Sequence, residues 1–317
     1  MTQLGLGLDL TTKRTRKREF LNEMDRVVPW PRLIALIEPH YPKGKTGRPP
    51  FPIVTMLRIH FIQQWFSLSD PAMEEALYDV PLYRQFASLD DGMARLPDES
   101  KILRFRHLLE THGLAAKMLA LVNEILTERG LTLKAGSAVD ATLIAAPSST
   151  KNGSGTRDPE MHSTQKAGNW YFGMKSHIGV DADSGLVHTV IGTAANVHDI
   201  TVAQALLHGE ETDVYADAGY QGIEKHCEAH AARWHVAMRP GKRRMLDRSD
   251  PLDAIYDEIE RLKAGIRAKV EHPFRVIKRQ FGYAKTRYRG LMKNTAQITT
   301  LFALSNLWMA RRALRKS

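Results

Sequence analysis

The sequence predicts an α/β protein in which a mixed five-stranded sheet, flanked by helices, follows a mostly helical N-terminal region. In the first 130 residues, apolar side chains recur at helical spacing between capping residues. From residue 132 onward, short stretches rich in small and β-branched residues indicate strands. Three strands come in succession and the later ones alternate with helices, which is typical of a mixed sheet.

The N-terminal region, residues 1–130, is predicted to be a helical domain of its own. Capping residues and glycines indicate where its helices begin and end. The expected helices lie at the end of 1–28, at 53–64, after Ser69 or Asp70 with Pro71 in the first turn, from the cap Asp98 to Gly113, and from 114 to Gly130.

The remaining residues, 131–317, are predicted to form the sheet and its helices. Residues 147–169 are polar and without periodicity, which predicts a mobile loop. The expected strands lie at 132–146, 172–195 (two strands around an Asp-Ser-Gly turn), 213–217 and 235–240. The expected helices lie at 199–207 with Asp199 as its cap, at 223–234, at 253–282 and at 291–315.

Composition indicates a folded globular chain. Of its 317 residues 43% are hydrophobic, enough for a sizeable core and for about two domains. No apolar run approaches the roughly 20 residues that a membrane span needs, and the basic N-terminal cluster follows its apolar residues, the reverse of a secretory signal. The single cysteine, Cys227, excludes an internal disulfide and any multi-cysteine zinc site. We therefore expect a soluble cytoplasmic protein with no membrane partner.

The net charge of +10 is unevenly distributed. Residues 1–50 hold 10 Lys and Arg against 5 Asp and Glu, and residues 239–290 hold 15 against 7. Residues 51–238, by contrast, hold 15 against 23. Basic segments of this kind attract a polyanion, most commonly nucleic acid. The alternative is a solvated basic surface that only aids solubility.

Two aspartates stand where apolar strands are predicted. Asp140 lies between Val139 and Ala141, and Asp217 ends the strand "DVYAD" just before Ala218 and a glycine. Burying a lone carboxylate is costly unless it is paired or binds a metal. If the two strands are neighbours, the carboxylates repel each other unless a cation lies between them. Mg²⁺ prefers such oxygen ligands and completes its shell with water and phosphate.

A third acid, Glu271, lies on the predicted helix 253–282. At about 100° per residue, it shares one face with Arg267, Arg275 and Lys278. Three acids could hold two Mg²⁺ ions, an arrangement suited to in-line attack on a phosphodiester. Pro273 predicts that the helix kinks there or restarts with the proline in its first turn. The face lies beside an apolar stripe of Ile259, Leu262, Ile266, Val270, Ile277 and Phe281.

Each acid also has a purely structural interpretation. Asp140 could pair with a lysine in the sheet, and Asp217 could cap the following helix. Glu271 could form i,i+4 ion pairs with Arg267 and Arg275, which is what such spacing usually indicates. The sequence alone leaves both interpretations open.

Several longer stretches together resemble a known family, the bacterial insertion-sequence transposases of the DDE type, in the group named after insertion sequence five. The resemblance covers nearly the whole chain. The matching stretches are "MLRIHFIQQWFSLSDPAMEEALYDVPLYRQF", "LPDESKILRFRHLLE", "AVDATLIAAPSSTKN", "FGMKSHIGVDADSGLVH", "AANVHDIT", "DVYADAGYQG", "IRAKVEHPFRVIKRQFGYAKTRYRGLMKN" and "LFALSNLWMARR".

The resemblance implies a ribonuclease-H-like catalytic domain with Asp140, Asp217 and Glu271 as its catalytic, metal-binding triad. The family's signature around the glutamate is Tyr, two residues, Arg, three residues, Glu, six residues, Lys. Arg267, Glu271 and Lys278 fit it, whereas Ala264 stands at the tyrosine position. Arg267 and Lys278 would then contact DNA near the cleavage site.

The implied activity is metal-dependent DNA cleavage and strand transfer. Two Mg²⁺ ions, with Mn²⁺ as a substitute, would activate water at the transposon end, and the freed 3′-hydroxyl would attack target DNA. The N-terminal helices would bind the terminal inverted repeats, and the enzyme would act as a homodimer on double-stranded DNA. Two alternatives remain: a metal-dependent nuclease without strand transfer, and a non-catalytic DNA-binding protein.

Other residues are secondary candidates. Arg275, Arg243 and Arg244 are expected to contact DNA, the last two from a basic loop at 240–250. Lys175 and His177 alternate along one strand and could line the DNA groove, although a solvated strand face explains them equally well. His198 and Tyr220 are expected beside the active site, with core packing as the alternative for the tyrosine.

Overall fold

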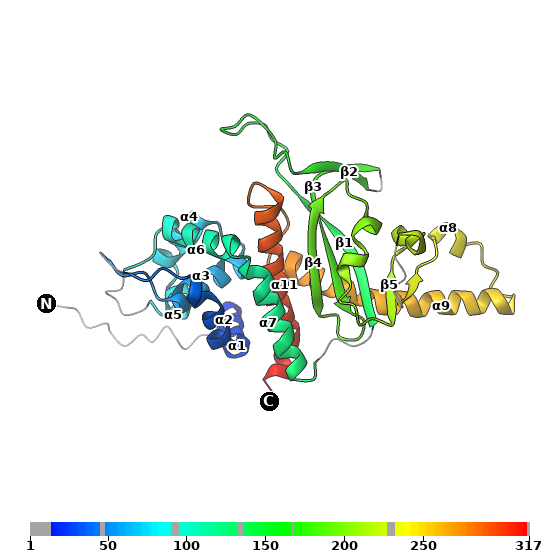
Figure 1. Ribbon diagram of the computed structural model, residues 1–317, viewed down its shortest axis with the longest axis horizontal. Helices are drawn as coiled ribbons and strands as arrows, with labels where there is room; N and C mark the ends of the chain where they lie inside the picture. Colours follow the sequence, from blue (N-terminus) through cyan, green and yellow to red (C-terminus); the bar gives the residue numbers. More distant parts are fainter. Residues whose placement is uncertain are drawn as a thin grey trace.

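The computed structural model describes residues 14–44, 48–89, 95–131, 136–166, 168–226 and 232–315. The N-terminal helices and the sheet lie on opposite sides of the long helix α11 (Leu291–Leu314), as Figure 1 shows. Helix α11 contacts α7 and α1 on one side and strand β4 on the other. No described helix has the length and apolar character that a bilayer crossing requires.

Helices make up the described part of residues 14–131, as the sequence predicts. Ser69 Oγ accepts a hydrogen bond from Ala72 N, so Ser69 caps the helix that begins at Asp70. Asp98 Oδ1 accepts from Lys101 N at 2.9 Å, which confirms the second predicted cap. The helices are α1 (Arg16–Val27), α2 (Trp30–Ile37), α3 (Ile53–Phe66), α4 (Asp70–Asp79), α5 (Pro81–Phe86), α6 (Glu99–Thr111) and α7 (Leu114–Glu128).

The sheet is mixed, in the order β4-β3-β1-β5-β6, with β2 paired to the outer end of β3. Strand β3 is antiparallel to both β4 and β1, and β5 is parallel to both β1 and β6. The strands are β1 (Gly136–Ala145), β2 (His162–Lys166), β3 (Asn169–Asp181), β4 (Val187–Ala194), β5 (Asp213–Ala216) and β6 (Arg233–Val236).

The described sheet has six strands, so the predicted count of five was wrong. The additional strand, β2, lies in the stretch 147–169 that the sequence predicted to be a mobile loop. Its side chains are exposed or half-buried, so no apolar alternation marks it. Backbone pairing with β3, for example Ser163 opposite Phe172, holds it instead.

The prediction for 199–207 also needs correction. Two short 3₁₀ helices, η3 (Asp199–Val202) and η4 (Gln204–Leu206), replace the expected helix. The cap is His198, whose Nδ1 accepts from Ile200 N, and not Asp199. Lys175 Nζ donates to Asp199 Oδ1 at 2.9 Å, so this ion pair takes up the carboxylate that was expected to cap. Cys227 lies outside the described residues.

The predicted helix 253–282 is present but changes pitch. It consists of α9 (Pro251–Arg267), the 3₁₀ turn η7 (Ala268–Val270), α10 (Glu271–Arg275) and the π-helical turn η8 (Val276–Gln280). Pro273 lies in the first turn of α10, where its missing N–H costs nothing, so the predicted restart is confirmed. The predicted apolar stripe is divided: Val270, Ile277 and Phe281 are buried, whereas Ile259 and Leu262 are exposed.

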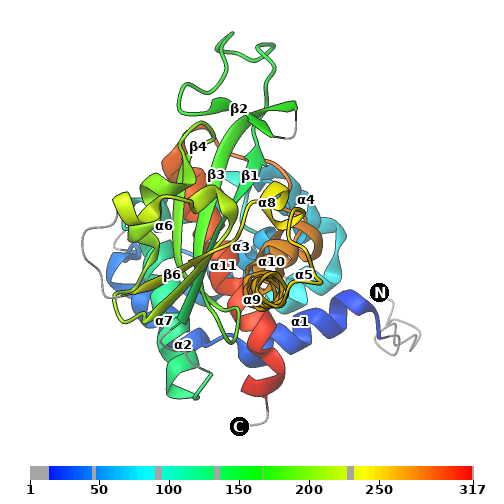
Figure 2. The ribbon, with the colours of Figure 1, turned by 90° about the vertical axis from the view of Figure 1, so that its right-hand side faces the viewer.

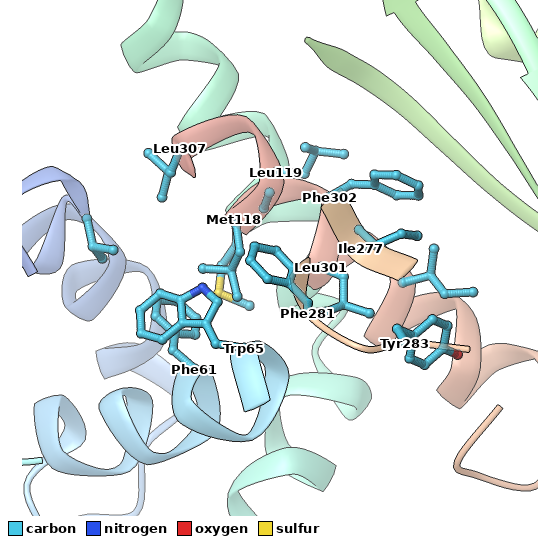
Figure 3. Close-up of a cluster of buried hydrophobic side chains, with 14 of the residues drawn as sticks. Phe61, Trp65, Met118, Leu119, Ile277, Phe281, Tyr283, Leu301, Phe302 and Leu307 are labelled. Carbon is cyan, nitrogen blue, oxygen red and sulfur yellow. The ribbon is translucent and has the colours of Figure 1, made fainter. Parts of the chain in front are cut away.

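One apolar core joins the helical part to the sheet. Figure 3 shows Phe61 and Trp65 of α3 beside Met118 of α7, with Leu301 of α11 and Phe281 close by. All five side chains are at most 2% exposed. The middle of α11, from Gln297 to Leu307, is buried on every side.

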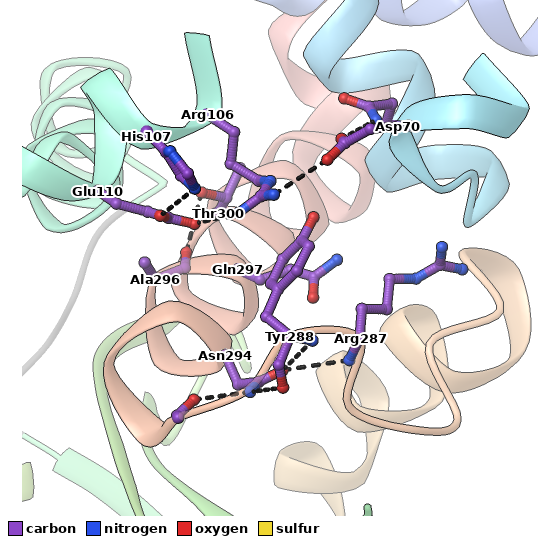
Figure 4. A network of polar contacts seen from close by, with 12 residues as sticks. Asp70, Arg106, His107, Glu110, Arg287, Tyr288, Asn294, Ala296, Gln297 and Thr300 are labelled. Atoms are coloured by element: carbon purple, nitrogen blue, oxygen red, sulfur yellow. Dashed lines mark hydrogen bonds and ion pairs between the residues drawn. The ribbon is translucent and has the colours of Figure 1, made fainter. Parts of the chain in front are cut away.

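A polar cluster provides a second junction between the two parts. The Arg106 guanidinium of α6 pairs with Asp70 at 3.0 Å and with Glu110 at 2.7 Å, as Figure 4 shows. It also lies over the ring of Tyr288, 3.9 Å from the ring centroid, on the segment that precedes α11. Asn294 of α11 fixes that segment by accepting from the backbone N–H of Tyr288. The helical part and the α11 segment are therefore joined by buried charge as well as by the core.

Candidate active site

Asp140 lies in the middle of β1, beside Asp217, which directly follows the paired strand β5. The parallel register of β1 and β5 pairs Val139 with Ala216, and the next residue on each strand is the aspartate. A parallel pair in register places the following residues at the same edge of the sheet. The sequence predicted this proximity on the condition that the two strands were neighbours, and they are.

Glu271 reaches the same region from the helical segment after α9. The turn η7 that precedes it contacts both β1 and β3. Lys269 Nζ of this turn donates to Ala182 O at 2.6 Å, and Val270 is fully buried. The turn is therefore fixed on the sheet, and Glu271 follows it as the first residue of α10, with an exposed side chain.

The charge of Asp140 depends on this arrangement. Burial raises the pKa of its carboxyl to about 7, a hydrogen bond from the Ala141 N–H opposes that rise, and the negative charge of Asp217 increases it. Arg267 lowers the pKa and Glu271 raises it further. The three acids and one arginine therefore act on one another, as expected for charges gathered at one site.

Backbone hydrogen bonds orient the two aspartates. The Ala141 N–H donates to Asp140 Oδ1 at 2.7 Å, and the Gly219 N–H donates to Asp217 Oδ1 at 2.8 Å. The second bond caps the 3₁₀ turn η5 (Ala218–Tyr220), so the structural interpretation of Asp217 is also correct. A Cβ at Gly219 would lie 2.9 Å from Asp217 Oδ1, which explains the glycine.

The acids have no cationic partner of their own in the part of the chain that the structure describes. Neither Asp140, Asp217 nor Glu271 forms an ion pair there, so the alternatives of a lysine pair and of i,i+4 arginine pairs are not realised. Mutually repelling carboxylates with only one arginine nearby are a donor set that fits a hard divalent cation. The residues that could hold it are Asp140, Asp217 and Glu271.

The basic residues predicted to contact DNA fall into two groups. Lys278 Nζ donates to Thr142 Oγ1 at 2.6 Å and to Leu143 O, which ties η8 to β1 beside the acids. Burial, and then the charge of Lys166, lower the Lys278 pKa. Lys175 is held by Asp199 and by Val197 O.

The side chains of the remaining cationic residues are exposed or half-buried. Arg243 pairs with Asp257 at 2.7 Å, across the loop between α8 (Pro240–Arg243) and α9. Arg244 and Arg275 are exposed, and Arg267 is half-buried near Asp140. Three of the six predicted DNA-binding residues, Lys278, Lys175 and Arg243, thus make internal contacts.

Tyr220 lies behind the two aspartates. It is fully buried, and its hydroxyl has no hydrogen-bond partner in the described structure. Burial raises its pKa, and the charges of Asp199, Asp140 and Asp217 add to the rise. His198, the other residue expected beside the site, is exposed and caps η3.

His177, which the sequence predicted could line the DNA groove, is instead a buried residue that contacts Thr193 and Asp199. His177 is fully buried, its Nε2 is 2.8 Å from Thr193 Oγ1, and its Nδ1 is 3.7 Å from Asp199 Oδ1. Burial lowers its pKa to about 4, so the ring is neutral. It does not line an open groove, and the only sequence signal for its role was its position two residues after Lys175.

A second group of potential metal ligands lies on the other face of the sheet. One ligand atom each from His188, His208 and Glu211 lies within 4.8 Å of the others. Ser137 Oγ, 3.0 Å from His188 Nε2, donates to Glu211 Oε1. Ser137 is three residues before Asp140 on β1, so its side chain points to the opposite face. Hydrogen bonds within the group account for its polar atoms, and it is separate from the three acids.

Comparisons with known proteins identify two matching families. Residues 132–307, more than half of the chain, match the model described as "Transposase DDE domain". Residues 9–108 match the model described as "Transposase domain (DUF772)". Among solved structures, a cryo-EM structure of the piggyBac transposase synaptic complex with hairpin DNA is similar over 93% of this chain and 76% of that chain, at 11% identity and a TM-score of 0.41.

Proposed function

Because the chain belongs to the family of proteins with a transposase DDE domain, and is a DNA transposase, we propose that Asp140, Asp217 and Glu271 are its catalytic acids. The observation that carries this assignment is the parallel register of β1 and β5, which sets Asp140 beside Asp217, with Glu271 close enough for its charge to act on Asp140. Carboxylates gathered with no ion-pair partner among the described residues are costly to the fold, and such arrangements occur at functional sites.

We further propose a ribonuclease-H-like fold for residues 131–317 and membership of the group named after insertion sequence five. The strand order β4-β3-β1-β5-β6, antiparallel on one side of β1 and parallel on the other, supports the fold, with β2 as an addition at the edge. The stretches "DVYADAGYQG" and "IRAKVEHPFRVIKRQFGY" support the group.

The residues of the site have distinct tasks in this proposal. The Ala141 and Gly219 N–H groups fix one oxygen of Asp140 and of Asp217. When bound, two Mg²⁺ ions, or Mn²⁺ in their place, would neutralise the acids and stabilise both the attacking and the leaving oxygen of a phosphodiester. The Arg267 cation, close enough to lower the Asp140 pKa, is placed to attract a DNA phosphate.

The expected reaction has two phosphoryl-transfer steps at this one site. Water attacks the phosphodiester at the transposon end, and the released 3′-hydroxyl then attacks a phosphodiester of target DNA. No side chain takes part as a covalent nucleophile. We propose that residues 1–130 bind the terminal inverted repeats as a separate domain, that Arg275 and Arg244 contact the DNA backbone, and that a homodimer acts on paired ends in the nucleoid.

Replacement of Asp217 by Asn tests the assignment. The variant keeps the shape of the side chain and its acceptor for Gly219 N, so inverted-repeat binding is expected to persist while Mg²⁺-dependent cleavage is lost. The matched control is Glu224→Gln, an exposed carboxylate on the neighbouring turn η6 (Ile223–Lys225), which is expected to cleave like the wild type. Cleavage by Asp217→Asn would show that the site is assigned wrongly.

A strand-transfer assay tests the second step separately. A DNA end that is already cut bypasses hydrolysis, so only the joining step is measured. Joining by the wild type and its loss in Asp217→Asn are expected. Cleavage without joining would mean that the protein acts as a nuclease under these conditions.

A further inference from the structure

Helix α9 carries large apolar side chains on its exposed face. Leu252 is 67% exposed, Ile255 57%, Ile259 41% and Leu262 59%. Figure 1 shows α9 extending from the sheet away from the helical part, and Figure 2 looks along its axis. Scattered exposed apolar residues are normal, but a row of them on one helix marks an interaction site.

The other face of α9 attaches the helix to the body by polar contacts. Glu260 is buried, and its Oε2 accepts from Met238 N at 2.8 Å. Lys263 Nζ donates to Val236 O, and Asp257 pairs with Arg243. The usual arrangement, with an apolar face inward and a polar face outward, is therefore reversed. The outward apolar face cannot be explained by the packing of α9 on its own domain.

The spacing of the exposed residues is that of a coiled-coil seam. Leu252, Ile255, Ile259 and Leu262 follow intervals of three, four and three residues, and the half-buried Ile266 continues the series after four more. These are the a and d positions of a heptad repeat, which bury their side chains only against another helix. The 17 residues of α9 span about 25 Å, at 1.5 Å per residue.

The charges of α9 indicate that this other helix is a second α9, running antiparallel. Residues 250–260 contain five acidic and no basic residues, and residues 261–269 contain four basic and no acidic ones. An antiparallel pair sets the acidic half of each copy against the basic half of the other, whereas a parallel pair sets like charges together.

The apolar seam is self-complementary in the same orientation. When Ile259 of one copy faces Leu262 of the other, Ile255 faces Ile266, each a position meets a d position, and residues 250–260 of each copy lie opposite the basic half of the other. A two-fold axis relates such a pair, as in most homodimers. We propose that α9 of one copy pairs antiparallel with α9 of a second copy and that this pair is a dimer interface of the protein. The proposal specifies a surface for the homodimer proposed above and does not depend on the catalytic assignment.

Pairing of α9 between two copies would also affect the proposed catalytic site. Helix α9 continues through η7 directly into Glu271, so pairing immobilises the element that carries the third acid. It also brings two sites into one assembly, as the joining of two DNA ends requires. The alternative partner for this seam is a segment of the same chain, residues 1–13. That segment includes Leu4, Leu6, Leu8 and Leu10.

Sedimentation of the full chain without DNA or added metal tests the pairing. The Asp217→Asn background keeps the result independent of catalysis. A dimer is expected at micromolar concentration, with at least a 10-fold weaker self-association after Leu262→Glu. Met292→Glu is the matched control, because Met292 is 67% exposed on α11 and lies outside the seam. Circular dichroism checks that both variants fold, as is expected for exposed positions. A monomeric wild type, or a Leu262→Glu dimer as stable as the control, would overturn the proposal.

Cysteine crosslinking tests the orientation. In a Cys227→Ser background, Ile255→Cys chains mixed with Ile266→Cys chains are expected to form a disulfide, because the two positions face each other across an antiparallel pair. Neither variant alone is expected to crosslink efficiently, since the same position in the two copies is about 16 Å apart along the helix. Efficient self-crosslinking of Ile255→Cys would indicate a parallel pair and refute the antiparallel one. Dimerisation only after removal of residues 1–13 would show that this segment occupies the seam and would overturn the proposal for the full chain.

Discussion

Replacing Asp140 by Asn should stabilise the metal-free protein while removing its activity. The reason is that the surroundings of Asp140 disfavour its charged form. Burial, and then the charges of Asp217 and Glu271, raise its pKa to about 7, compared with 3.8 for an unperturbed aspartate. The asparagine keeps the size of the side chain and its acceptor for Ala141 N, but it carries no charge at any pH.

The magnitude follows from the shift in pKa. Between pH 3.8 and 7 the unfolded chain releases this proton and the folded chain retains it, so stability falls as the pH rises. Each pH unit contributes about 1.4 kcal/mol, which gives an upper limit of about 4 kcal/mol above pH 7, reduced by solvent screening of the half-buried carboxylate. The advantage of Asp140→Asn should therefore be near zero at pH 4, increase up to pH 7 and stay constant above it.

Urea unfolding in chelator, at several pH values from 4 to 8, measures this difference in the free energy of unfolding. Comparing variant with wild type at each pH cancels the titration of all other groups. Asp79→Asn, an exposed aspartate on α4, is the control, and it should change stability by less than about 0.5 kcal/mol. Added Mg²⁺ should stabilise the wild type and have much less effect on Asp140→Asn. A variant that is less stable than the wild type at pH 8, or a difference that does not change with pH, would refute the electrostatic description of the site.

Two further predictions concern stability away from the acids. Arg106→Met should lower the free energy of unfolding by about 3–5 kcal/mol, because it leaves two buried carboxylates without their cation; chemical denaturation measures this, and a change below about 1 kcal/mol would contradict it. Acid should also destabilise the protein: burial lowers the pKa of His60 and His188 to about 4, so between pH 6.5 and 4 the unfolded chain binds protons that the folded chain does not. In the Asp140→Asn background, which removes the opposing titration of Asp140, a melting temperature unchanged between pH 7 and 4.5 would exclude this mechanism.

The parts of the fold that depend on local chemistry could be predicted from the sequence. Ser69 and Asp98 cap helices because their side chains reach backbone N–H groups a few residues away, and this needs no tertiary structure. Asp140 lies within one apolar strand and Asp217 ends another, so the sequence could predict that the two aspartates meet if those strands are neighbours. The two carboxylates are close together only because β1 and β5 are neighbouring strands, and the structure shows that these strands pair in parallel.

The parts that depend on distant partners could not be predicted. Strand β2 exists through backbone pairing with β3, and its exposed side chains carry no pattern. Asp199 was expected to cap a helix, but Lys175, distant in sequence and adjacent in space, binds its carboxylate instead. The apolar residues of α9 were expected in a buried seam because helical spacing identifies a shared face without indicating whether that face meets its own domain or another chain.

The three acids are held by two different kinds of structure, and this has a consequence for how the site can be disturbed. Asp140 lies within β1 and Asp217 directly follows the paired strand β5, so the hydrogen bonds of the sheet fix their separation. Glu271 instead follows a 3₁₀ turn that is attached by Lys269 to Ala182 O and by the buried side chain of Val270. Because α9 enters this turn directly, a change along α9 can move the glutamate while the sheet and the two aspartates stay in place. The position of the third acid is therefore the part of the site that a partner chain on α9 can influence.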